Sequence, residues 1–186
     1  MMFCEPVDIA HNMWPTGGTY IGGAWEMYAR QALAGFRTYR IPVGVDSYNG
    51  PTQSFAPFKY VQIHVTAFED ATWVVIDNGT EHLEVGLDMG QTYASQGTIN
   101  EMIHEPIRID ENTIVSANKD IQVGILTGSN GTYQTRLFNA IPLRAYGRDY
   151  VVPVTGAPDA PGNVYLFNPN ARPAQVTVFD PTRPAG

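Results

Sequence analysis

The alternation of apolar and polar positions predicts short β-strands along most of the chain. Around residue 60 the apolar side chains of Val61, Ile63 and Val65 share one face of a strand, and Gln62 and His64 share the other. Similar segments recur, most of them bounded by turn residues, at a spacing typical of a sandwich or barrel. The predicted strands span 36–43, 60–68, 72–77, 82–87, 113–117, 121–126, 133–139, 149–154, 163–168 and 175–179.

One hairpin has the strongest sequence support. The pair Asn78-Gly79 separates strands 72–77 and 82–87, and Asn-Gly turns through positive φ at low steric cost. Glu69-Asp70 is interpreted in the same way, as a hairpin turn between two strands. Alternation then predicts one shared core, made by Val61, Ile63, Trp73, Val75, Val85 and Leu87.

The first 35 residues have a different pattern. Helix formers dominate 24–34 and Gly35 provides a stop, which predicts one short helix. Upstream, 14–19 and Gly22-Gly23 have the composition of loops. We therefore expect residues 1–35 to form an irregular N-terminal arm.

An internal repeat changes the expected architecture. Segment 37–43 shares its Arg, Tyr, Pro and Val with 148–154, and segment 61–77 aligns without gaps over 164–180. Duplication explains both matches and their shared order; the alternative is that strands of similar composition resemble one another. The predicted fold is all-β: an antiparallel β-sandwich unit over 36–147, followed by the first half of a second unit over 148–186.

Composition narrows the classes of partner. The net charge is -7 and the eleven basic residues are scattered, which argues against a nucleic-acid groove or an anionic membrane surface. No apolar run reaches the roughly 20 residues of a membrane helix, so we expect no membrane insertion. Cys4 is the single cysteine, which excludes an intramolecular disulfide. The start lacks the features of a signal peptide, so for an exported protein we expect the leader to have been removed or to lie outside this numbering.

Several motifs together carry a family resemblance. Segments 63–76, 85–93, 114–123 and 147–153 resemble successive motifs of the IgGFc-binding protein N-terminal domain family. The resemblance covers roughly residues 60–180, and the chain departs from it at Asp120, where the family usually has Pro. It implies a surface-exposed β repeat associated with mucus, matrix or microbial surfaces, hence an extracellular or cell-surface location, and carries no catalytic residues. The family name is not a reason to expect that this chain binds antibodies.

Candidate chemistry is sparse. His64 with Glu69-Asp70, together with His82 and His104-Glu105, contains metal-ligating and acid-base residue types, but their spacing matches no ligand pattern. Asp110-Glu111-Asn112 has oxygens for Ca²⁺ but few grouped carboxylates, so a solvated turn is the favoured interpretation. We predict no catalytic residue, no metal and no cofactor.

Two sequons are candidate glycosylation sites, at Asn78 and Asn130. The alternative is that both Asn-Gly pairs simply serve hairpin turns.

The incomplete second unit suggests a function. Its apolar positions have no facing sheet within the repeat, and two covers are open: the chain's own arm, residues 1–35, or β-strand addition from another copy. Head-to-tail addition gives a filament or surface layer, so the first hypothesis is a non-enzymatic extracellular structural protein that forms homo-oligomers. The alternatives are a monomeric adhesion or ligand-binding module, with glycans as a candidate ligand, and a secreted hydrolase. The residues expected to mediate assembly are Tyr150, Val152, Val164, Leu166, Val176 and Val178.

Overall fold

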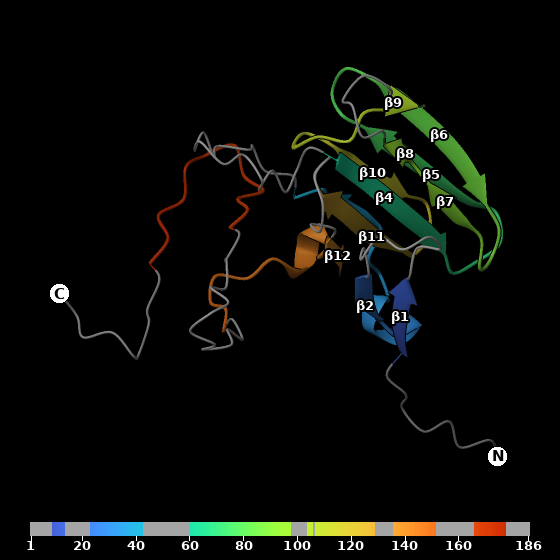
Figure 1. Cartoon of the computed structure of the whole chain (residues 1–186), viewed down its shortest axis with the longest axis horizontal. Coiled ribbons are helices and arrows are strands. Elements are labelled where there is room, and N and C mark those ends of the chain that lie inside the picture. Colours follow the sequence, from blue (N-terminus) through green and yellow to red (C-terminus); the bar gives the residue numbers. More distant parts are fainter. Residues whose placement is uncertain are drawn as a thin grey trace, which may run out of the picture. The chain divides into compact units, whose positions relative to one another are not determined.

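The protein is all-β, as the alternation pattern predicted, and its two main antiparallel sheets are visible in the computed structural model (Figure 1). Its helical turns are short: the 3₁₀ segments η1 (Arg30–Leu33) and η2 (Leu143–Ala145). The structure describes residues 9–13, 23–42, 60–97, 104–105, 107–128, 136–151 and 166–177. Contacts divide the chain into two units, residues 1–150 and residues 151–186.

Two four-stranded sheets build the first unit. Sheet I has the order β3-β10-β5-β6, and sheet II has the order β12-β11-β4-β7. The strands of sheet I are β3 (Thr38–Arg40), β10 (Ile114–Ala117), β5 (Thr72–Asp77) and β6 (His82–Leu87). Those of sheet II are β12 (Arg136–Asn139), β11 (Ile121–Gly128), β4 (Tyr60–Ala67) and β7 (Thr92–Ala94). β5 and β6 have the predicted bounds, and β4, β10 and β11 differ from prediction by two residues or fewer.

The prediction of a hairpin at Glu69-Asp70 is wrong. β4 belongs to sheet II and pairs with β11, whereas β5 belongs to sheet I and pairs with β6 and β10. Residues 68–71 therefore carry the chain from one sheet to the other. The links from β6 to β7 and from β10 to β11 also cross between sheets.

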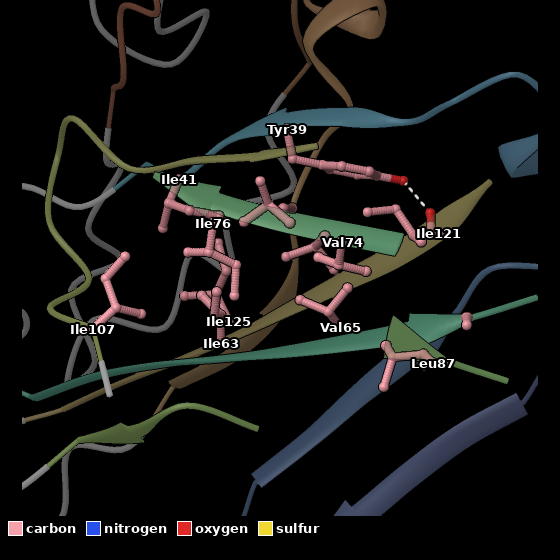
Figure 2. Close-up of a cluster of buried hydrophobic side chains, with 14 residues drawn as sticks. Tyr39, Ile41, Ile63, Val65, Val74, Ile76, Leu87, Ile107, Ile121 and Ile125 are labelled. Carbon is pink, nitrogen blue, oxygen red and sulfur yellow. Dashed lines mark hydrogen bonds between the residues drawn. The ribbon is translucent and has the colours of Figure 1, made fainter. Parts of the chain in front are cut away.

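The core lies between the two sheets (Figure 2). Sheet II contributes Ile63, Val65 and Ile125, and sheet I contributes Val74 and Val115, all fully buried. The hydroxyl of buried Tyr39, on β3, donates a 2.6 Å hydrogen bond to the carbonyl of Ile121, on β11, so one side chain joins the sheets. Desolvation, with a smaller contribution from the Asp120 charge, raises the pKa of the Tyr39 phenol well above its usual value.

The predicted core is correct for β4 and β6 but shifted by one residue on β5. Val74 and Ile76 face inward and are fully buried, whereas Trp73 is 57% exposed. The register pairs Val74 with Val85 and Ile76 with Leu83, so these side chains share the inner face. The Trp73 ring lies instead on the outer face, over Gly86, where a side chain would meet the indole at 3.5 Å.

The Asn78-Gly79 turn is confirmed as a hairpin. Gly79 has a φ of 85°, and the Asn78 amide N–H donates to the Glu81 carbonyl at 3.2 Å. The Asn78 side-chain oxygen also accepts hydrogen bonds from the backbone of Thr80 and Glu81. Positive φ therefore falls on the glycine, which has no Cβ to clash.

The predicted helix over 24–34 is wrong. β2 (Gly23–Met27) pairs with β1 (Ile9–Met13), and only Arg30–Leu33 forms a 3₁₀ turn. Cross-strand pairing with β1 outweighs the helix propensity of 24–27, which is a weak local preference. β2 lies close to β12, the edge strand of sheet II. A further small sheet joins β8 (Gln96–Gly97) and β9 (His104–Glu105). None of these four short strands was predicted.

The described part of the second unit contains no strand. Residues 166–177 form no sheet, so the strands predicted at 163–168 and 175–179 are absent over their described residues. The described part of the predicted strand 149–154, residues 149–151, is likewise unpaired. Apolar side chains that the pattern assigned to a buried face are largely exposed here: Leu166 at 63% and Val176 at 55%.

Candidate functional site

Three sheet-to-sheet crossings meet at one end of the sandwich. They are residues 68–71, 88–91 and 118–120, and hydrogen bonds connect them directly. The Asp70 carboxylate accepts from the Met89 N–H at 3.0 Å, and the Asp88 carboxylate accepts from the Ala71 N–H at 3.1 Å. Ala71 has a φ of 51°, the positive-φ conformation that side chains rarely adopt, and this exchange holds it in place. We call this region the crossing end.

The turn at 118–120 joins the same network. The Asn118 side-chain oxygen accepts from the Trp73 N–H at 2.8 Å, and the Lys119 ammonium donates to the Asp70 carbonyl at 2.5 Å. The Thr72 hydroxyl, which is buried, donates to the Glu69 carbonyl at 2.7 Å. These bonds fix the start of β5 and explain why Thr72, rather than Trp73, points inward.

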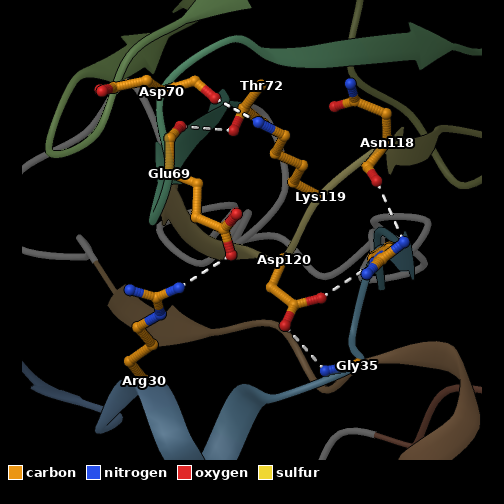
Figure 3. Close-up of polar contacts among 9 residues, drawn as sticks. Arg30, Gly35, Glu69, Asp70, Thr72, Asn118, Lys119 and Asp120 are labelled. Carbon is orange, nitrogen blue, oxygen red and sulfur yellow. Dashed lines mark hydrogen bonds and ion pairs between the residues drawn. The ribbon is translucent and has the colours of Figure 1, made fainter.

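The segment leading into β3 closes the crossing end (Figure 3). Asp120 accepts from the Gly35 N–H at 2.9 Å and from Arg37 Nε at 3.0 Å, while Arg30 pairs with Glu69 at 2.8 Å. The Gly35 hydrogen bond, followed by the Arg37 hydrogen bond and charge, lowers the pKa of the Asp120 carboxyl below its usual value. Asp120 is therefore ionised at neutral pH, and it ties the N-terminal segment to the turn between β10 and β11.

The carboxylates of the crossing end hold the three crossings together. Glu69, Asp70 and Asp120 are each engaged by backbone groups or by a cation. Within the described ranges, no three His, Cys, Asp or Glu side chains are grouped so as to hold a metal ion. In the same ranges, no helix has the length and apolar character to cross a membrane.

The remaining predicted metal or acid-base candidates lie apart from this cluster. His82 is on the exposed face of sheet I, between Asp77 at 3.4 Å and Glu84 at 3.3 Å, and hydrogen bonds to Glu84 and then Asp77 raise its pKa. His64 lies on the face of β4 opposite Ile63, as alternation predicted. Cys4 and the side chains of His104 and Glu105 lie outside the described residues.

Asp110-Glu111-Asn112 forms a turn. The Asp110 carboxylate accepts from the Asn112 N–H at 2.9 Å, and the Thr113 hydroxyl accepts from the Asp110 N–H at 2.8 Å. This is the local side-chain-to-backbone bonding of an Asx turn. The geometry supports the turn interpretation of this segment.

The first sequon has a structural role in its hairpin. Asn78 is 6% exposed, and its Nδ2 donates to Glu81 Oε2 at 2.9 Å and to the Arg108 carbonyl at 3.0 Å. These bonds tie the hairpin to Arg108, in the segment before β10, which supports the alternative that the Asn-Gly pair serves the turn. Glycosylation at Asn78 stays a prediction, and Asn130 lies outside the described residues.

The predicted assembly residues are exposed where they are described. Tyr150 is 59% exposed, and its hydroxyl accepts a 2.6 Å hydrogen bond from the Gly147 N–H. Val151, which the pattern did not single out, is 99% exposed. Val152, Val164 and Val178 lie outside the described residues.

A cavity of about 450 Å³ borders the crossing end within the first unit. Its lining includes Arg37 and Arg144, which are far apart in sequence. Sequence reasoning gave neither a functional role: Arg37 was noted only as part of the internal repeat, and Arg144 lies in no recognisable motif.

Comparisons of the chain with protein-family models, with curated proteins and with solved structures find no match. The resemblance to the IgGFc-binding protein N-terminal family therefore stays a prediction.

Proposed function

We propose that this protein is a non-enzymatic structural subunit of the cell exterior, whose copies join when the C-terminal segment of one adds β-strands to a sheet edge of the next. The observation that carries the proposal is a contrast between equivalent positions of the internal repeat. Ile63 and Tyr39 are fully buried in the sandwich, whereas their counterparts Leu166 and Tyr150 are 63% and 59% exposed. The same pattern is covered by a facing sheet in one place and uncovered in the other.

Burying the exposed apolar side chains of the second repeat lowers the free energy. Each apolar side chain moved from water into a packed interior contributes about 1.5 to 3 kcal/mol. An added strand also satisfies backbone donors and acceptors that a sheet edge leaves to solvent.

Sheet I offers an acceptor. β6 is its edge strand, six residues long, and within the described ranges no strand pairs with its outer side. Leu83, Val85 and Leu87 alternate toward the core along β6. A donor that alternates in the same way, as Val176 and Val178 do in sequence, would continue the apolar face across the new strand pair.

Two observations support the proposed location, the architecture and the resemblance. Sandwiches of short antiparallel strands are common in cell-surface domains, and the resemblance implies the same setting. The candidate catalytic groups that the structure describes are engaged in turns, ion pairs or strand faces, which supports a structural function over a hydrolytic one.

The test is assembly of the purified chain, measured by size-exclusion chromatography and negative-stain imaging. We expect large assemblies for the full chain, and monomers both after removal of residues 150–186 and for the double variant Leu166→Asp and Val176→Asp. The matched control is Ala171→Asp with Ala174→Asp, which adds the same charge to exposed positions of the same segment.

Hydrogen exchange locates the acceptor. We expect the amides of β6 to become protected in the assembled full chain and to exchange faster in the double variant. A full chain that stays monomeric at high concentration, or a truncated chain that still assembles, would remove the proposal.

A further inference from the structure

The cavity beside the crossing end has the chemistry of an anion site. Its volume is about 450 Å³, and its lining combines two basic residues with apolar residues, a glycine and a threonine. The lining residues are Gly35, Phe36, Arg37, Thr38, Ala117 and Arg144. They come from the segment before β3, from β3 itself, from the end of β10 and from η2, so the folded sandwich assembles the cavity.

The Arg37 guanidinium is held in place by two hydrogen bonds and keeps further N–H donors for a ligand. Its Nε donates to Asp120 at 3.0 Å and its Nη1 donates to the Asn118 carbonyl at 3.0 Å. A guanidinium carries five N–H donors, so about three remain after these two. An arginine oriented by a carboxylate behind it presents its remaining donors in a fixed geometry, which lowers the entropy lost on binding.

Arg144 supplies a second guanidinium without a competing carboxylate. It lies on η2 and is exposed, and no described residue forms a hydrogen bond or ion pair with its side chain. The lining therefore carries two positive charges, Arg37 and Arg144, and Asp120, which is outside the lining, pairs with Arg37. This excess of positive charge stands in a chain whose net charge is -7.

We propose that this cavity binds a small oxyanion group, a sulfate or a carboxylate carried by a larger ligand, between Arg37 and Arg144. Guanidinium groups match the planar or tetrahedral oxygens of such anions with paired hydrogen bonds. The Thr38 hydroxyl, in the same lining, adds a neutral donor. Phe36 and Ala117 are the apolar side chains of the same lining.

The experiment titrates the full chain with sodium sulfate at constant ionic strength and follows amide chemical shifts by NMR. We expect saturable shifts at Arg37, Thr38 and Ala117, and a loss of affinity of about tenfold in Arg144→Gln. The matched control is Arg108→Gln, which removes the same charge from an exposed site beside the Asn78 hairpin and should change affinity less than twofold.

Two further arms identify the source of the oxyanion. Sodium acetate reports on a carboxylate, and a sulfated disaccharide reports on a sulfate carried by a sugar. Tighter binding of acetate than of sulfate assigns the cavity to carboxylates, and the reverse order assigns it to sulfated ligands. Shifts that grow linearly without saturation in every arm, or equal affinity in Arg144→Gln and the unmodified chain, would overturn the proposal.

This site is independent of strand addition. Both arginines lie in the first unit, so a chain without residues 150–186 should keep sulfate binding even where assembly is lost. Failure of one proposal leaves the other standing.

Discussion

Residues 37–42 and 61–77 carry patterns related to those of 148–151 and 166–177, and these described parts of the two regions have different surroundings. In the first region Tyr39 sits in the core and hydrogen-bonds across to sheet II, while in the second the Tyr150 hydroxyl accepts a hydrogen bond from the nearby Gly147 N–H. Ile63 is packed between sheets, and its counterpart Leu166 faces solvent. At these equivalent positions the strand-like sequence forms a paired, buried strand in the first region and is unpaired and exposed in the second, because the burial that stabilises a strand is supplied by other parts of the chain.

The largest difference in stability between the two regions is expected when the equivalent residues Ile63 and Leu166 are each shortened to alanine. Ile63→Ala should lower the free energy of unfolding by about 2 to 5 kcal/mol, since it leaves a cavity in a packed core. Leu166→Ala should change it by less than about 0.5 kcal/mol, because an exposed side chain loses little. Urea denaturation of the monomeric chain at low concentration measures both. Equal losses in the two variants would show that Leu166 is buried and would end the comparison.

A smaller effect is expected from removing the two tyrosine hydroxyls. Tyr39→Phe deletes the 2.6 Å hydrogen bond to the Ile121 carbonyl and leaves that buried acceptor short of a partner, at a cost of about 1 to 3 kcal/mol. Tyr150→Phe should be neutral, because water replaces its hydroxyl at the Gly147 N–H. Thermal unfolding gives the difference, and a destabilised Tyr150→Phe would contradict the assignment of this residue to an uncovered region.

The smallest effect is electrostatic and depends on pH. Asp120→Asn should cost about 1 kcal/mol at pH 7 by weakening the charge-assisted bonds to Gly35 and Arg37. The folded-state pKa of Asp120 is lowered, so its contribution is complete above the unfolded pKa and is lost as the pH falls through the folded value.

The gap in stability between Asp120→Asn and the unmodified chain should therefore close below about pH 4. Asp149→Asn, at the exposed counterpart of the β3 region, is the control and should leave the pH profile unchanged. A gap that persists at low pH would show that Asp120 acts through packing rather than through its charge.

The sequence was most informative where pattern and turn chemistry agreed. The bounds of β5 and β6 were predicted because Asn78-Gly79 fixes their connection locally. The inward-facing set of side chains on β5 was not predicted correctly. The run Trp73-Val74-Val75-Ile76 is apolar at every position, so alternation cannot tell which side chains face the core. The choice is made by contacts distant in sequence: Asn118 holds the backbone of Trp73, and Gly86 leaves room for the indole ring outside the core.

Contacts between residues distant in sequence also explain why the candidate site was poorly predicted. Glu69-Asp70 was noticed because the residues are adjacent, but its interpretation as a hairpin failed because β4 pairs with β11 rather than with the next strand. The bond between Arg37 and Asp120 spans 83 residues, and nothing local in either segment indicates it. The N-terminal helix was predicted from propensity alone, and pairing between β1 and β2 reversed it.

The position of β4 in sheet II has a consequence for how the protein is made. β4 lies between β11 and β7, and its long partner β11 follows it by more than fifty residues. As the chain leaves the ribosome, the β5–β6 hairpin has both of its strands at once, but β4 waits until β11 has been synthesised. Pairing of segments so distant in sequence is slow, and for that interval the edge of β4 that pairs with β11 has no partner strand. The nascent chain is then most prone to aggregate, and a chaperone that holds β4 would act in that interval.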